Sequence, residues 1–213
     1  MIFKSVYQFI KITLFAIFAF ISSTSQAFDT YEYPLMQFHV RGFSYSGDKY
    51  KSFSDSGPGF SAGLAFLGRG QNFTPIYRID TGGQTGRQAF LDGSTELILN
   101  YAYRYTAAEI GTYYFPAKRL NGGISPYLGG TAVIGVNSIE LKSIQVFNAL
   151  PTSDNNIIFG YRLCTGAEWF LTPRVGRPKW TLYTELGFKK ENSKILNQNF
   201  STQNIDFTVA LGW

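Results

Sequence analysis

The last nine residues, Ile205-Asp206-Phe207-Thr208-Val209-Ala210-Leu211-Gly212-Trp213, decide how the rest of the chain is interpreted. Large apolar residues occupy every second position, and polar or small residues lie between them. Side chains of a β-strand point alternately to opposite faces, so one face of a sheet would receive every large residue. An ordinary half-buried strand of a soluble protein has the same pattern, so the remaining sequence must distinguish the two cases.

The same alternation recurs along the chain, and helical periodicity appears nowhere at length. The segments between the alternating stretches fall into two length classes that follow one another in turn. Short turns separated by longer polar loops are the layout of a bacterial transmembrane barrel. The alternating stretches are 36–41, 60–66, 77–80, 97–104, 127–136, 157–169 and 180–189; the short segments are 68–72, 116–124 and 172–179; the long ones are 47–57, 82–93, 138–156 and 190–203.

One stretch, 105–110, departs from a regular alternation because Tyr105 and Ile110 both look lipid-facing. Either a single strand carries a bulge there, or residues 106–108 form a turn. If both chain ends lie on the periplasmic side, the number of strands must be even. Taking 94–115 as one bent strand gives eight, whereas dividing it gives nine. We therefore expect an all-β fold, an eight-stranded antiparallel up-and-down transmembrane barrel.

The N-terminus has the form of a secretory signal. Lys4 and Lys11 precede an apolar run at 12–21, and a small-residue site ends in Ser25-Gln26-Ala27. The apolar run is too short to cross about 30 Å of hydrocarbon as a helix. The expected domains are a cleaved signal peptide, 1–27, and an outer-membrane barrel, 28–213.

Composition restricts the functional class. Aromatic residues make up 17% of the chain and charged residues only 15%, which suits a protein partly solvated by lipid. The net charge of +5 falls to +3 without Lys4 and Lys11, which is too weak to indicate nucleic-acid binding. Cys164 is the single cysteine, so no internal disulfide can form.

The polar face indicates which side of the barrel meets lipid. A soluble lipocalin-like barrel would turn its apolar face inward and cover its outside with Lys and Glu. Here the polar face consists of small residues and a few charges of both signs, which suits a narrow lumen with paired charges. The expected lumen network comprises Arg162, Glu168 and Glu185, with Arg41, Arg104 and Glu109 as further candidates; Arg78 lies on the same polar faces.

The sequence offers little for catalysis or metal binding. Acyl transfer to lipid typically uses a serine with a histidine base. His39, the single histidine, is expected to face the lumen mid-strand, where it hydrogen-bonds. We expect no catalytic residues, no cofactor and no metal site. Five basic residues are expected on the periplasmic side, near phospholipid head groups or solvated: Lys118, Arg119, Arg174, Arg177 and Lys179.

Four segments resemble the strands of small outer-membrane barrels of the OmpA, OmpX and opacity-protein kind: 109–115 (EIGTYYF), 125–130 (SPYLGG), 166–169 (GAEW) and 183–188 (YTELGF). The C-terminal residues Phe207, Val209, Leu211 and Trp213 resemble the signal read by the outer-membrane assembly machinery, which usually ends in Phe rather than Trp. The resemblance is good over 109–213 and rests on pattern alone before that. It implies an architecture rather than a chemistry.

These observations predict a non-enzymatic protein of the bacterial outer membrane with a structural or surface-interaction role through its external loops. A narrow pore for small solutes is the alternative, and a lipid-modifying enzyme is a weaker one. The expected partners are outer-membrane lipids, the barrel-assembly machinery and an extracellular ligand.

Overall fold

The fold is described from a computed structural model, which places residues 36–45, 58–68, 70, 72–92, 95–119, 123–142, 153–171, 180–195 and 198–213. The expected signal peptide and the basic residues Arg174, Arg177 and Lys179 lie outside these residues. Within them no helix has the length and apolar character needed to cross a bilayer. The strands are β1 (Met36–Tyr45), β2 (Gly59–Leu67), β3 (Phe73–Asp92), β4 (Thr95–Tyr114), β5 (Ile124–Lys142), β6 (Ser153–Phe170), β7 (Thr181–Ile195) and β8 (Gln198–Gly212).

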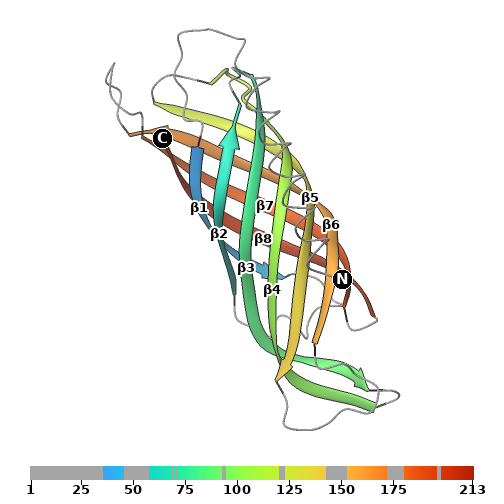
Figure 1. Ribbon diagram of the computed structural model, residues 1–213. Coiled ribbons are helices and arrows are strands. Elements are labelled where there is room, and N and C mark those ends of the chain that lie inside the picture. The colour runs from blue at the N-terminus through green and yellow to red at the C-terminus, as the bar shows by residue number, and fades with distance from the viewer. Residues whose placement is uncertain are drawn as a thin grey trace.

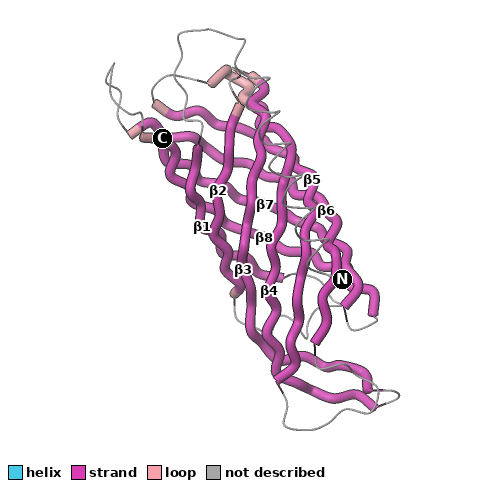
Figure 2. The backbone as a smooth tube through the Cα atoms, in the orientation of Figure 1, coloured by secondary structure: helices cyan, strands magenta, loops and turns pink. Residues whose placement is uncertain are grey.

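The eight strands form a closed antiparallel barrel in which each strand pairs with its neighbours in sequence (Figures 1 and 2). Closure is made by β1 and β8, whose ladder runs from Gln37 opposite Gly212 to Tyr45 opposite Asn204. A closed barrel has no free sheet edge where it closes, so every backbone group there can pair. The expected eight-stranded barrel is confirmed.

The irregularity expected at 105–110 is absent. β4 is one continuous strand, paired with β5 from Asn100 opposite Lys142 to Tyr114 opposite Leu128 without a slip. Neither a bulge nor a turn occurs there. Tyr105 faces the interior and Ile110 the exterior, so the side-chain chemistry changes along the strand while the backbone alternation does not.

Several segments expected to be long external loops are strands. Residues 82–92 continue β3, which pairs with β4 as far as Asp92 opposite Thr95. The ends of β5 and β6 likewise continue into the expected loop 138–156, and those of β7 and β8 into 190–203. As a result the β3–β4 hairpin projects beyond the barrel body at the lower end of Figure 1, opposite the end that carries the C-terminus.

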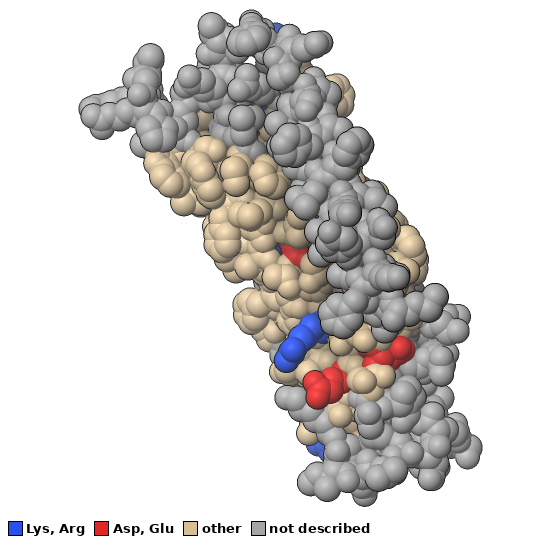
Figure 3. Space-filling view, in the orientation of Figure 1, with Lys and Arg blue, Asp and Glu red and all other residues tan. Residues whose placement is uncertain are grey.

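The barrel body turns its large apolar side chains outward. Phe207, Leu186 and Leu163 are each more than half exposed on the outside, whereas Arg41, Arg78 and Arg162 are buried inside. Exposed charged side chains of the described residues gather toward the lower end of the face in Figure 3. This arrangement is the reverse of a water-soluble barrel and requires an apolar solvent around the body.

In the lower part of the barrel most large apolar side chains point inward instead of outward. We call this part the outer extension; it comprises residues 84–92 of β3, 95–105 of β4, 137–142 of β5 and 153–158 of β6. There Asn100, Arg104 and Glu140 are exposed on the outside, with Ile98 and Ile157 as the exposed apolar residues among them. The inward face is apolar and aromatic instead. Its buried side chains, with neighbours from the barrel body, are Phe43, Leu99, Tyr101, Tyr103, Tyr105, Ala107, Val133, Ile139, Leu141 and Ile158.

Candidate functional site: the closed lumen

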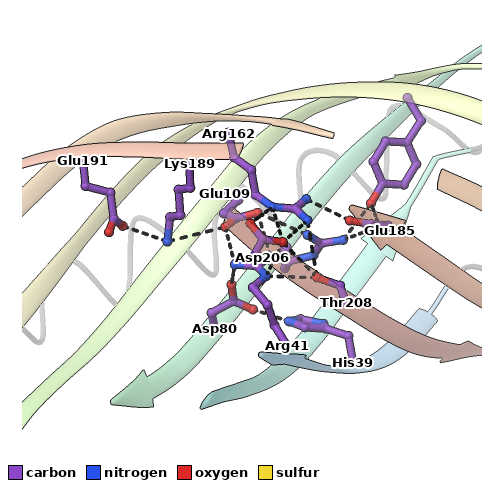
Figure 4. Close-up of polar contacts among 12 residues, drawn as sticks. His39, Arg41, Asp80, Glu109, Arg162, Glu185, Lys189, Glu191, Asp206 and Thr208 are labelled. Carbon is purple, nitrogen blue, oxygen red and sulfur yellow. Dashed lines mark hydrogen bonds and ion pairs between the residues drawn. The ribbon is translucent and has the colours of Figure 1, made fainter. Parts of the chain in front are cut away.

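The middle of the lumen holds a layer of charged side chains from β1, β3, β4, β6, β7 and β8, which we call the central layer (Figure 4). Each side chain sits at an inward position of its strand, so the period-2 alternation alone aims it at the barrel axis. Space for them comes partly from glycine. A Cβ on Gly187 would lie 2.6 Å from Nη2 of Arg162 and 2.7 Å from both carboxylate oxygens of Asp206.

Arg41 of β1 pairs with acids from three other strands. Its Nη1 donates to Oδ2 of Asp80 at 2.5 Å and to Oε1 of Glu109 at 2.9 Å. Its Nε donates to Oγ1 of Thr208 at 3.1 Å and lies 3.6 Å from Oδ1 of Asp206. One guanidinium therefore connects β1 with β3, β4 and β8.

Arg162 and Arg78 meet at Glu185 of β7. Arg162 donates to both carboxylate oxygens of Asp206, from Nε to Oδ2 at 2.9 Å and from Nη2 to Oδ1 at 2.6 Å. Its Nη1 donates to Oε2 of Glu185 at 2.8 Å. Arg78 donates to the other Glu185 oxygen at 2.9 Å and to Oε2 of Glu109 at 3.3 Å. These paired contacts use the fork geometry of arginine against carboxylates.

Two tyrosines also donate hydrogen bonds to Glu185, Tyr113 of β4 and Tyr127 of β5. The Tyr127 hydroxyl donates to Oε1 of Glu185 at 3.0 Å, and the Tyr113 hydroxyl donates to the same oxygen. The two rings stack with centroids 4.4 Å apart. Gly129 makes room for this stack, since a Cβ there would lie 2.7 Å from the Tyr113 ring. Tyr127 brings β5 into the layer, so seven of the eight strands contribute to it.

Two further groups extend the layer at its edges. Lys189 pairs with Glu191 at 2.7 Å and lies 5.0 Å from the centroid of the Tyr105 ring, over its face. His39 is fully buried, and its Nε2 lies within hydrogen-bonding distance of Oδ1 of Asp80. His39 therefore occupies the lumen, as the sequence predicts, and points away from any lipid substrate.

A second, smaller cluster lies near the short-turn end of the barrel. Arg119, just after β4, donates from Nε and Nη2 to the two carboxylate oxygens of Glu168 at 2.7 and 2.6 Å. Its Nη2 also reaches the Tyr183 hydroxyl at 2.8 Å, which in turn donates to Glu168 at 2.5 Å. Arg119 is thus buried inside the mouth, and the expectation of a solvated or head-group position for it was wrong; Lys118 beside it is exposed.

The expected network residues separate into three groups. The central layer brings together Arg41, Glu109, Arg162 and Glu185. Glu168 lies in the lumen but pairs with Arg119 instead. Arg104 departs from the expectation: it faces outward and is exposed, because β4 keeps one phase through Tyr105.

The predicted network lacks several residues of the central layer. Asp80, Asp206, Lys189 and Glu191 each stand at an inward position of an alternating stretch or its continuation, so the phase of the strand was the available signal. Arg78 was placed on the polar face but not in the network. Arg119 follows a strand rather than lying in one, and no periodic pattern indicates its direction.

A closed antiparallel barrel with an apolar exterior and a charged, hydrogen-bonded interior is the architecture of transmembrane β-barrels of the bacterial outer membrane. This protein is an eight-stranded barrel of that class. The resemblance of its strands to small outer-membrane barrels is thereby confirmed at the level of the fold.

Comparison with known proteins adds structures of similar fold but no close relative. No protein-family model and no curated protein matches the chain. Neisserial surface protein A shares 14% identity over 83% of this chain and 93% of its own, with a TM-score of 0.48. The attachment invasion locus protein Ail of Yersinia pestis shares 13% over 84% and 95%, at 0.43, and OprG of Pseudomonas aeruginosa 12% over 86% and 97%, at 0.42.

Proposed function

We propose that this protein is a non-enzymatic integral barrel of the bacterial outer membrane whose lumen is sealed and whose functional surface is its external end. The supporting observation is the central layer, in which Arg41, Arg78 and Arg162 are each at most 1% exposed. In eight-stranded barrels side chains fill the interior, and paired charges in that space oppose the passage of ions. A structural or surface-interaction role follows, because neither transport nor chemistry has a place in such a lumen.

The external end is the part available to a partner. The outer extension carries polar side chains outward, among them Asn100, Arg104 and Glu140, as a surface in water does. Because its strands continue those of a rigid barrel, the extension is a stable support for a binding surface. An extracellular ligand is accordingly part of the proposal, together with outer-membrane lipids around the body and the barrel-assembly machinery acting on the C-terminal strand.

The alternatives have less support. A narrow pore would need a continuous polar path, whereas the described lumen is occupied by the central layer and by the apolar inward face of the outer extension. A lipid-modifying enzyme would need a histidine near the lipid surface, whereas His39 is buried against Asp80. Export through a cleaved signal peptide ending at Ala27 completes the proposal.

Single-channel recording in planar bilayers tests the seal. We expect the folded protein to leave the bilayer current at its baseline in 1 M KCl across the usual voltage range. Discrete, reproducible conductance steps from protein verified as folded by its heat-dependent electrophoretic mobility would overturn the sealed lumen and favour the pore.

A further inference from the structure

We propose that the turn Phe115–Arg119, after β4, is a latch that closes the periplasmic mouth of the lumen, and that Arg119 holds it shut. β2 ends and β3 begins at this end of the barrel, β4 ends and β5 begins there, and the C-terminus lies there too. Because bacterial outer-membrane barrels have their short connections on the periplasmic side, we assign this end to the periplasm. The latch goes beyond the proposed seal, because it closes a different place from the central layer and through different residues.

The local backbone directs Arg119 inward. The N–H of Lys118 donates to the carbonyl oxygen of Phe115 at 3.2 Å, which closes a tight turn with Pro116 at its second position. Lys118 then adopts a φ of 62°, the single positive value among the described non-glycine residues. This left-handed step reverses the chain direction so that Lys118 points to solvent and Arg119 to the lumen.

The contacts of Arg119 join the turn to the opposite wall. Glu168 belongs to β6 and Tyr183 to β7, and the two face each other across one rung of that ladder. Arg119 also lies 5.6 Å from the centroid of the Phe115 ring. Arg119 is only 3% exposed, so its guanidinium is buried between the turn and two strands that are distant in sequence.

The base of the latch is held from the neighbouring turn. Asn72, before β3, donates its side-chain amide to the carbonyl of Phe115 at 3.0 Å, and the Phe115 N–H donates to the carbonyl of Asn72 at 2.7 Å. Phe115 is therefore anchored, while Arg119 is attached to the wall through its side chain. The contacts of Arg119 are separate from this anchor, so releasing its side chain leaves the hydrogen bonds between Phe115 and Asn72 in place.

The chain carries its own reporter for such an opening. Cys164, the single cysteine, lies on β6 and faces the lumen of the barrel. It stands between Arg162 of the central layer and Glu168, the partner of Arg119, and is 8% exposed. Cys164 packs in a buried cluster with Tyr113, Tyr127 and Tyr183, so a reagent that enters from the periplasmic mouth meets this thiol beside the tyrosines and before the charged side chain of Arg162. A purely stabilising ion pair would alter unfolding but would not alter access to Cys164 in the folded barrel.

The test measures how fast 2-(trimethylammonium)ethyl methanethiosulfonate modifies Cys164 in the folded full-length mature protein, followed by intact mass. We expect slow modification of the native protein and at least about tenfold faster modification of Arg119→Ala. Glu168→Gln breaks the same contact from the wall and should also accelerate modification, which keeps the test valid if Arg119→Ala does not fold.

Two controls locate the route. Lys118→Asn removes a neighbouring exposed charge while tolerating the positive φ, and should leave the rate unchanged. Tyr105→Ala opens packing on the far side of the central layer and should also leave it unchanged. The latch is refuted if folded Arg119→Ala and Glu168→Gln both react at the native rate, or if Tyr105→Ala accelerates modification as much as they do.

Discussion

The outer extension continues four strands of the barrel body, β3 to β6, and most of its apolar side chains point inward instead of outward. On β5, Ile134 and Val136 point outward and are 36% and 43% exposed, whereas Ile139, three residues beyond Val136, points inward and is 2% exposed. The backbone alternation is unbroken between them. The surrounding solvent changes instead. Lipid around the body favours apolar side chains on the outside, whereas water around the extension favours apolar side chains on the inside. The comparison places the outer boundary of the membrane near Thr106 of β4 and Val136 of β5, which face each other.

The largest effect should come from breaking the charged interior of the body. Glu185→Ala leaves Arg78 and Arg162 without a shared carboxylate, and truncating one partner of a buried pair costs about 3–5 kcal/mol. The measurement is the free energy of unfolding by urea in lipid vesicles. Glu140→Ala, the same change on the outside of the extension, should stay within about 0.5 kcal/mol; equal losses in the two variants would contradict a buried network.

The next effect concerns a charge aimed at lipid. Val209→Arg on β8 should cost about 2–4 kcal/mol if it lies near the bilayer midplane. Asn100→Arg, which points outward from the extension, should be tolerated because its side chain meets water. The yield of folded, heat-modifiable protein in outer-membrane fractions distinguishes them. Normal folding of Val209→Arg together with failure of Asn100→Arg would invert the assignment of body and extension.

A matched pair of isoleucines on β5 sharpens the comparison. Ile139→Ala removes packing from the apolar interior of the extension and should cost about 2–3 kcal/mol, at the lower end for a buried isoleucine. Ile134→Ala should cost less than about 1 kcal/mol, since lipid chains can fill the space that the side chain leaves. Limited proteolysis of the extension and urea unfolding together measure both. A larger loss from Ile134→Ala than from Ile139→Ala would contradict the assignment of an apolar, packed interior to the extension.

The smallest effect should be at Arg104. Because its side chain is exposed, Arg104→Ala should change the unfolding free energy by no more than about 0.5 kcal/mol. Arg41→Ala, the same truncation inside the lumen, should be destabilising by several kcal/mol because Asp80 and Glu109 lose their shared partner. Similar urea midpoints for these two variants would place Arg104 in the network after all.

Much of the barrel follows from local pattern. Period-2 alternation and the parity of the strand number predict eight strands, and the first strand, 36–45, and its closure against the last are as expected. Inward positions such as Arg162, Glu168 and Glu185 follow from the phase of their strands. These properties belong to the extended backbone itself, which sends neighbouring side chains to opposite faces whatever surrounds it.

Three features were decided by the tertiary structure. The inward tyrosines of β4 and the outward Arg104 depend on where the strand leaves the lipid, which the alternation of one strand does not encode. The partner of each charge depends on the stagger of strands around the closed barrel: Glu168 meets Arg119 and not Arg162. Arg119 itself enters the lumen because one residue, Lys118, takes a left-handed conformation in the turn before it. Sequence thus determined which residues point inward along the lipid-embedded part of each strand, and closure of the barrel determined which of them meet, because contacts across the lumen join residues far apart in the chain.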